Sequence, residues 1–225
     1  MLAIAHRGAE THFPENTLSA FEKAIELGAD AIELDAHVCM SGEPVVMHDN
    51  TIDRTTSRKG KIAKMNLAQL EALDAGDGKG VPSLIKALNL VNRRCKVFIE
   101  VKDVSAALPI AKVVQYCVDH KGWSYSELPI VSFFHQALAM IHEKHPKIIT
   151  GASVHKVPES LAACAEFTDS HYFLPRIDAL TEELVADARM RKVKIIAWTA
   201  RDEAEVEQAK QFDIDGIIAA DPSWV

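Results

Sequence analysis

The sequence predicts an α/β fold, a TIM (β/α)8 barrel with a small insertion after the second strand, formed by a single domain over residues 1–225. Short β-branched or apolar runs alternate with segments of helical period, the pattern of parallel strands joined by crossover helices. The length of 225 residues lies within the range usual for this barrel, about 200 to more than 400. An open doubly wound sheet is the main alternative, but no GxGxxG turn follows the first run.

Eight runs have the length and composition of strands, and each is bounded by polar or turn-forming residues. In chain order, the expected strands cover residues 3–6, 31–36, 96–102, 129–134, 147–153, 171–174, 194–199 and 216–220. Between them, apolar residues recur at the spacing of an amphipathic helix. The expected helices cover residues 17–27, 83–92, 105–121, 136–145, 159–167, 181–192 and 202–212. Pro82 and Pro158 stand near the expected starts of two helices, where proline is tolerated.

A ninth extended run, residues 44–48, follows the second strand after a turn of only three residues, Ser41-Gly42-Glu43. A parallel crossover requires a dozen or more residues, so we expect this run to form a hairpin arm on the second strand. Residues 49–80 follow, and they are rich in charged residues and glycine. We interpret them as an insertion that stands over the mouth of the barrel.

Composition limits the class of protein. With 48% hydrophobic and 25% charged residues, the chain can bury a core as one globular domain. A net charge of −7 argues against binding to nucleic acid or to an anionic lipid surface, because both need a positive field. The four cysteines show no CxxC spacing, which favours free thiols in a reducing compartment. No leader or long apolar run is found, so we expect a soluble, cytoplasmic protein that does not bind membranes.

Polar side chains gather at the ends of the predicted strands, the place where barrel enzymes carry their reactive groups. The residues concerned are His6, Arg7, Glu33, Asp35, His48, Glu100 and Lys102. Glu33 and Asp35 differ by two positions, as do Glu100 and Lys102, so each pair projects from one face of its strand. Both pairs can therefore point into the mouth of the barrel.

Three carboxylates inside a barrel repel one another and lose hydration, so the sequence predicts a compensating cation beside Glu33, Asp35 and Glu100. A set of oxygen ligands suits Mg²⁺ or Ca²⁺, with Mn²⁺ as a third candidate, better than zinc. Salt bridges to Arg7 and Lys102 alone are the alternative interpretation. His6 and His48 at the same mouth can supply one proton donor and one acceptor near neutral pH, as cleavage of a phosphodiester requires.

The motifs along the chain resemble the glycerophosphodiester phosphodiesterase family, in particular its cytoplasmic bacterial type. They occur in this order: His6-Arg7-Gly8, Pro14-Glu15-Asn16-Thr17, Glu33-Leu34-Asp35, His48-Asp49, Val81-Pro82-Ser83-Leu84, Glu100-Val101-Lys102, Ser132-Phe133, Trp198-Thr199 and Asp215-Gly216-Ile217-Ile218. The resemblance covers nearly the whole chain, and as a set the motifs are highly specific.

The resemblance implies a role for each matched position. Glu33, Asp35 and Glu100 would bind the metal, and His6 and His48 would act as general acid and base. Arg7 and Lys102 would hold the phosphate. The substrate would be a small glycerophosphodiester, cleaved through a cyclic phosphate to glycerol 3-phosphate and an alcohol. Which histidine removes the first proton stays open.

Some positions have two interpretations. Trp198 is expected to line the pocket and pack against the glycerol carbons, although a core role is also consistent with the sequence. Glu15 and Asn16 form either a helix N-cap or a direct substrate contact. The C-terminal motif reads Ala219-Ala220-Asp221-Pro222, where the family pattern places a hydroxyl before the Asp-Pro pair.

Two other functions compete with hydrolysis of soluble diesters. A phospholipase acting on intact lipids would need an apolar rim that faces the membrane. A catalytically silent barrel that binds phosphodiesters or a protein would be expected to lack at least one of the five acid and histidine positions, and all five are present. The head-group preference, the physiological metal and the oligomeric state, including a homo-oligomer, stay open.

Overall fold

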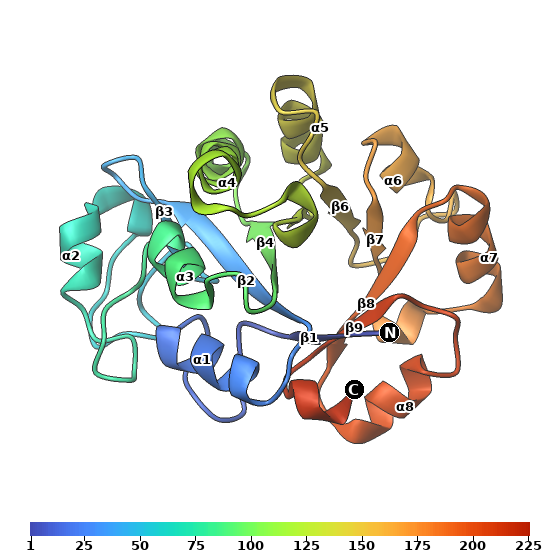
Figure 1. Cartoon of the computed structure of the whole chain (residues 1–225), viewed down its shortest axis with the longest axis horizontal. Helices are drawn as coiled ribbons and strands as arrows, with labels where there is room; N and C mark the ends of the chain where they lie inside the picture. The colour runs from blue at the N-terminus through green and yellow to red at the C-terminus, as the bar shows by residue number, and fades with distance from the viewer.

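The computed structural model describes all residues, 1–225, and has the closed (β/α)8 barrel that the sequence predicts (Figure 1). Eight parallel strands form the barrel, and it closes where β1 pairs with both β2 and β9. The strands are β1 (Leu2–Ala5), β2 (Ala31–Val38), β4 (Lys96–Val101), β5 (Ile130–Ser132), β6 (Thr150–Ser153), β7 (Tyr172–Leu174), β8 (Lys194–Ala200) and β9 (Gly216–Ala219). All eight predicted strands are confirmed, and closure excludes the open sheet.

Helices lie outside the strands around the barrel (Figure 1). They are α1 (Leu18–Glu26), α3 (Leu84–Val91), α4 (Ala107–Lys121), α5 (His135–Lys144), α6 (Ala163–Phe167), α7 (Glu182–Met190) and α8 (Glu203–Ala209). Short polar side chains begin several of them: Thr17, Ser83, Thr181 and Asp202 each accept a hydrogen bond from a backbone N–H of the first turn. None of these helices is long and apolar enough to cross a bilayer.

The predicted helix 159–167 is wrong in its first half, because α6 begins only at Ala163. Leu161 has a left-handed backbone, with φ of 54°, which ends any helix through that position. The backbone N–H of Ala162 donates to the carboxylate of Asp187 on α7 at 2.9 Å, so its partner lies outside the local segment. A long-range contact therefore overrides the local helical pattern here.

The extra extended run forms β3 (Pro44–Val46), which pairs antiparallel with β2 and confirms the predicted hairpin arm. Residues 49–80 follow it and contain α2 (Leu67–Glu71), which lies beside β3 at the left of Figure 1. This segment has its own small hydrophobic cluster, which includes Ile52, Ile62 and Leu70. It packs on one side of the barrel, and the arrangement of this segment as an insertion over the mouth stays a prediction.

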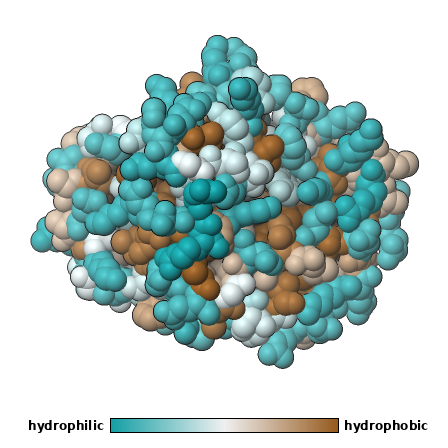
Figure 2. All heavy atoms as spheres, viewed as in Figure 1, coloured by the Kyte–Doolittle hydropathy of each residue, from teal (hydrophilic) through white to brown (hydrophobic).

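Alternate residues of the strands fill the interior of the barrel. Ile4, Ala31, Phe98, Val131, Tyr172, Leu174, Ile196 and Ile218 form one buried cluster there. Glu33 and Asp35 follow Ala31 at the same two-residue spacing, and Glu100 follows Phe98, so these acids point inward as well. Larger clusters lie between the strands and the helices. On the face shown in Figure 2, hydrophilic residues alternate with hydrophobic groups that are visible in several separate places.

Candidate active site

A cavity of about 440 Å³ opens at the mouth of the barrel. Seven of the eight predicted site residues line it: His6, Arg7, Glu33, His48, Glu100, Lys102 and Trp198. The eighth, Asp35, is buried beside Glu33 and Glu100. A larger hollow of about 720 Å³ lies near α6, but none of the predicted residues lines it. The chemistry is therefore concentrated in the smaller cavity.

Three acids come together at this mouth, and one oxygen from each of Glu33, Asp35 and Glu100 lies within 4.8 Å of the others. Burial raises the pKa of Glu33 well above its usual value, and the charges of Asp35 and Glu100 raise it further. Burial, followed by the charge of Asp35, raises the pKa of Glu100 to about 7. Burial opposes ionisation of Asp35 as well, but Lys102 and Arg7 outweigh it and lower the pKa of Asp35.

The donor chemistry of this cluster fits a hard divalent cation. All three candidate donors are carboxylate oxygens, and Mg²⁺ and Ca²⁺ prefer such oxygens over nitrogen or sulfur. Burial raises the pKa of both Glu33 and Glu100, so their ionised forms are disfavoured unless additional positive charge stabilises them. A bound cation would supply that charge.

Arg7 and Lys102 lie beside the acids, so the salt bridges considered as an alternative are also present. Lys102 Nζ is 2.7 Å from Glu100 Oε1 and 3.2 Å from Asp35 Oδ1. Arg7 Nε is 3.1 Å from Asp35 Oδ2, although the pair is not aligned as a hydrogen bond. Arg7 also pairs with Glu15 at 2.9 Å. Arg7 is therefore shared between Asp35 and Glu15. The two positive charges of Arg7 and Lys102 do not balance the negative charges of the carboxylates around them.

The loop after β1 is held in place by its backbone. The N–H of Arg7 donates to Glu33 Oε2 at 3.1 Å, and Arg7 has a left-handed φ of 52°. Gly8 follows with φ of 85°, and a Cβ atom at this position would lie 2.8 Å from the backbone of Ala20 on α1. Glycine is therefore required where the loop crosses α1. This close approach places His6 and Arg7 at the cavity.

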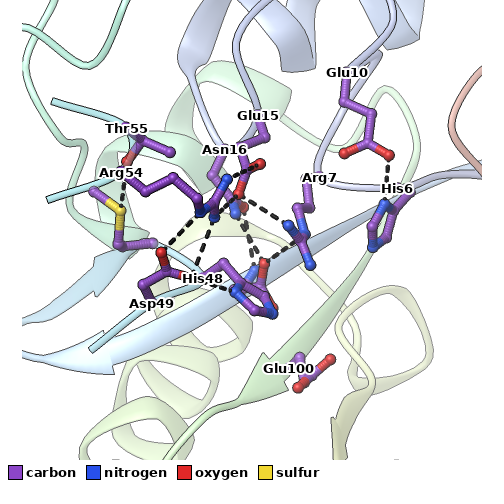
Figure 3. Close-up of polar contacts among 12 residues, drawn as sticks. His6, Arg7, Glu10, Glu15, Asn16, His48, Asp49, Arg54, Thr55 and Glu100 are labelled. Carbon is purple, nitrogen blue, oxygen red and sulfur yellow. Dashed lines mark hydrogen bonds and ion pairs between the residues drawn. The ribbon is translucent and has the colours of Figure 1, made fainter. Parts of the chain in front are cut away.

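Each predicted catalytic histidine has a carboxylate partner at Nδ1 (Figure 3). His6 Nδ1 lies 2.7 Å from Glu10 Oε1, and His48 Nδ1 lies 2.7 Å from Asp49 Oδ1. A carboxylate accepts the Nδ1 proton, so each pair favours the tautomer whose Nε2 is free to accept a proton. In Figure 3 the two imidazoles lie on either side of Arg7, with Glu100 below them.

Asn16 has a different role from either of those considered from the sequence. The N-cap of α1 is the next residue, Thr17, whose hydroxyl accepts from Ala20 N. Asn16 instead holds Asp35: its Nδ2 donates to Asp35 Oδ2 at 2.8 Å, and its Oδ1 accepts from Asp35 N at 3.2 Å. The N-cap interpretation of Asn16 is therefore wrong, because its left-handed backbone turns the side chain toward β2.

Arg54 is a site residue that the sequence did not indicate. Its guanidinium donates to both oxygens of Glu15, at 2.7 and 2.8 Å, and to Asp49 at 2.8 and 3.2 Å. The hydrogen bond from Arg54 is the largest cause that lowers the pKa of Asp49 to about 2. Arg54 thus links segment 49–80 to the partner of His48, and no local motif marks such a long-range contact.

Aromatic side chains line the other side of the cavity. Phe133 and His155 stack with ring centroids 4.1 Å apart, and Trp198 meets them edge-on at 5.2 and 5.8 Å. The indole N–H of Trp198 donates to Leu174 O at 2.8 Å, which fixes the ring in the cavity wall. Phe133 and His155 were not predicted as site residues, although Phe133 belongs to a motif that the resemblance uses.

Two further features lie apart from this cavity. His12 Nε2 is 2.8 Å from Asp221 Oδ2, so this loop histidine pairs with the residue that follows the Ala219-Ala220 dipeptide. Neither His12 nor Asp221 lines the cavity. The glycine-rich loop 76–80 turns on Asp74, whose Oδ1 accepts from the backbone N–H groups of Gly76 and Gly78.

The sequence matches one family model, described as the glycerophosphoryl diester phosphodiesterase family, over residues 6–223. A curated relative, the glycerophosphodiester phosphodiesterase of Caldanaerobacter subterraneus subsp. tengcongensis, is 33% identical over 98% of this chain and 94% of its own. A glycerophosphodiester phosphodiesterase of Bacillus altitudinis is 29% identical over 97% of this chain and 94% of its own.

Solved structures have the same fold. A phosphodiesterase of Oleispira antarctica, in complex with the product sn-glycerol-3-phosphate, superposes with a TM-score of 0.89 at 26% identity, covering 98% of this chain and 93% of that one. The glycerophosphodiester phosphodiesterase of Thermotoga maritima has a TM-score of 0.81 at 24% identity, covering 99% and 96% of the two chains. At 24% identity, the similarity to the Thermotoga maritima structure shows only that the two chains share a fold.

Proposed function

The chain belongs to the glycerophosphoryl diester phosphodiesterase family, a family of enzymes, and on that basis we propose that it hydrolyses glycerophosphodiesters to glycerol 3-phosphate and an alcohol with the help of one divalent cation. The observation that carries this proposal is the gathering of three acids, two histidines and two cations at one end of the barrel. The product bound to the Oleispira antarctica phosphodiesterase supports the same reaction. We also infer that residues 1–225 act as one catalytic domain, with residues 49–80 as an insertion.

Glu33, Asp35 and Glu100 would hold the cation, with Mg²⁺ or Ca²⁺ favoured and Mn²⁺ as a third candidate. When bound, such an ion supplies Lewis-acid stabilisation of negative charge on the phosphoryl oxygens. Arg7 and Lys102 would hold the phosphate, because both side chains are largely buried at the cavity wall beside the acids. Trp198 would contact the carbon atoms of the substrate.

The two histidines would move the protons. One accepts the proton of the glycerol hydroxyl next to the phosphate. The oxygen of that hydroxyl then attacks phosphorus. The other donates a proton to the leaving alcohol as its bond to phosphorus breaks, which yields a cyclic phosphate. In the second step the roles reverse: water attacks phosphorus, the ring opens, and glycerol 3-phosphate is released. Glu10 and Asp49 orient the imidazoles through both steps.

The test is turnover of glycerophosphodiesters by the purified protein, with glycerol 3-phosphate identified as the product. We expect activity that chelator abolishes and that Mg²⁺, Ca²⁺ or Mn²⁺ restores. His6→Ala and His48→Ala should each lower kcat by about 10²- to 10⁴-fold, because each removes a general acid or base. His142→Ala is the matched control, since His142 is an exposed residue that pairs with Asp169 outside the cavity.

Full activity in chelator would disprove the metal requirement, and full activity in His6→Ala would disprove the site. Vesicles of intact phospholipid are the comparison substrate. Faster turnover of vesicles than of soluble diesters would favour the lipid-cleaving alternative.

A further inference from the structure

The cavity has two walls of different chemistry. Its only acidic lining residues, Glu33 and Glu100, lie on β2 and β4. A second group of lining residues lies on β8 or within two residues after β5, β6 and β8, and we call it the β8 wall: Phe133, Phe134, His155, Trp198, Thr199 and Arg201. β8 stands across the barrel from β4 in the strand order, so the β8 residues of this wall face Glu100, whereas Phe133 and Phe134 follow β5, the neighbour of β4.

Arg201 is the one permanently charged residue of the β8 wall, and it forms no ion pair. Its backbone N–H donates to Glu205 Oε2 at 2.7 Å, so the nearest acid binds its main chain and not its guanidinium. Arg176 lines the adjoining hollow and gives the contrast, because it donates two hydrogen bonds to Asp178, at 2.6 and 2.8 Å. The guanidinium of Arg201 therefore has no carboxylate in ion-pair contact, although Glu205 lies close to its main chain.

The other polar groups of the β8 wall carry no negative charge. Thr199 carries a hydroxyl with no hydrogen-bond partner in the protein, and His155 is held by stacking on Phe133. Both can donate a hydrogen bond, as Arg201 does. None of these wall residues is a carboxylate; Asp178 and Glu205 line only the adjoining hollow, where Asp178 is paired with Arg176. A ligand complementary to this wall carries acceptor oxygens and negative charge.

The leaving alcohol is the part of the substrate that would reach this wall. The attacking and leaving oxygens of a phosphoryl transfer lie roughly in line on opposite sides of phosphorus. If the glycerol hydroxyl attacks from the side of the acid cluster, the alcohol departs toward β8. Trp198 then borders the alcohol, whereas the sequence led us to expect a contact with the glycerol carbons.

We propose that the β8 wall is a head-group subsite in which Arg201 selects diesters whose alcohol carries an anionic group, such as a second phosphate, over those with a choline or ethanolamine group. This inference rests on the proposed hydrolysis and names the substrate class for the same cavity. Arg201 lines both the cavity and the adjoining hollow of about 130 Å³, and because Asp178 and Glu205 also line that hollow, we place the anionic group on the cavity side of Arg201.

Three substrates of graded charge test the proposal: bis(glycerophospho)glycerol, glycerophosphoglycerol and glycerophosphocholine. Initial rates are measured per scissile bond, with release of glycerol 3-phosphate as the readout. In the unmodified protein, kcat/KM should decrease in that order. Arg201→Gln should lower the ratio of kcat/KM for bis(glycerophospho)glycerol to that for glycerophosphocholine about tenfold, the effect of losing one charge-assisted contact. Arg201→Lys should keep the order.

Arg176→Gln is the matched control, because it removes a nearby positive charge that lines only the adjoining hollow and is already paired. It should leave the order and the ratio unchanged. Equal loss on all three substrates in Arg201→Gln, or a choline diester turned over as well as the anionic one by the unmodified protein, would overturn the subsite. Failure to release glycerol 3-phosphate from any of the three would instead count against the proposed function.

Discussion

At the scale of single residues, the site depends on side chains that hold the acids as well as on the acids themselves. Asn16 makes two hydrogen bonds to Asp35, one to its carboxylate and one from its backbone N–H. Partners of this kind orient metal ligands, and their loss weakens metal binding or activity by about 10- to 100-fold. Asn16 also has φ of 59°, a backbone that favours asparagine or glycine over other residues.

Asn16→Gly should therefore weaken the affinity for the activating cation by about 10- to 100-fold while leaving the fold intact. Glycine keeps the left-handed backbone and removes only the side-chain contacts. The measurement is the metal concentration that gives half-maximal activity, together with a far-UV spectrum. Asn92→Gly is the control: Asn92 has φ of 46° at the C-terminus of α3, away from the cavity, and should show no change in metal affinity.

At the scale of elements, segment 49–80 packs against itself through a close contact between its helix and its last glycine. A Cβ atom on Gly80 would lie 1.9 Å from the carbonyl oxygen of Glu71, the last residue of α2. Real Cβ atoms do not approach backbone that closely, so an alanine would force α2 and residue 80 apart. The contact explains why position 80 is glycine.

Gly80→Ala should destabilise the protein by about 3 kcal/mol, at the upper end of the usual cost of overpacking. Gly78→Ala is the control in the same loop. A Cβ atom there meets nothing within 4 Å, and the cost should be only the strain of a non-glycine residue at φ of 75°, about 1 kcal/mol. Urea unfolding measures both. Equal losses in the two variants would contradict the steric explanation.

At the scale of the whole molecule, the buried acids couple stability to pH. In metal-free protein, burial raises the pKa of Glu100 to about 7, above the 4.5 of an ordinary glutamate. Between these values the folded chain binds a proton that the unfolded chain lacks, so the contribution of Glu100 to the free energy of unfolding falls as pH rises from 4.5 to about 7. Glu33 acts in the same direction.

Glu100→Gln should therefore become more stable relative to the unmodified protein as pH rises from about 5 to 8, with chelator present in both. The comparison between the two proteins is needed because burial lowers the pKa of His37, whose contribution to stability rises with pH. Urea unfolding at several pH values measures the difference. A constant difference across this range would show that Glu100 titrates normally in the folded chain.

Cation binding should reverse this dependence in the unmodified protein. A metal ion must displace the protons held by the acids, so its stabilisation grows as pH rises through about 7. At 100 times the dissociation constant, a bound ligand adds about 2.7 kcal/mol to the free energy of unfolding. Glu100→Gln should gain less than the unmodified protein from the same cation. An equal gain would indicate that Glu100 is not a ligand.

The sequence by itself determined the barrel and the acids that point into it. Strand residues alternate between the two faces, so spacings of two place Glu33 with Asp35 and Glu100 with Lys102 wherever the strands lie. His6 and His48 are also placed by local patterns, since His6 follows β1 directly and His48 stands two residues after the end of the hairpin arm. The eight strands and the hairpin arm are likewise local patterns, and all of them appear in the structure.

Only the tertiary structure decided which side chains support those residues. Asn16 reaches Asp35, and Arg54 reaches Glu15, across 19 and 39 positions of the chain. The position of Arg201 across the cavity from Glu100 depends in turn on closure of the barrel. Local periodicity carries no information about such contacts, because they form only when loops from separate strands are packed together. The physical reason is that hydrogen bonds depend on distance in space, while a pattern records distance along the chain.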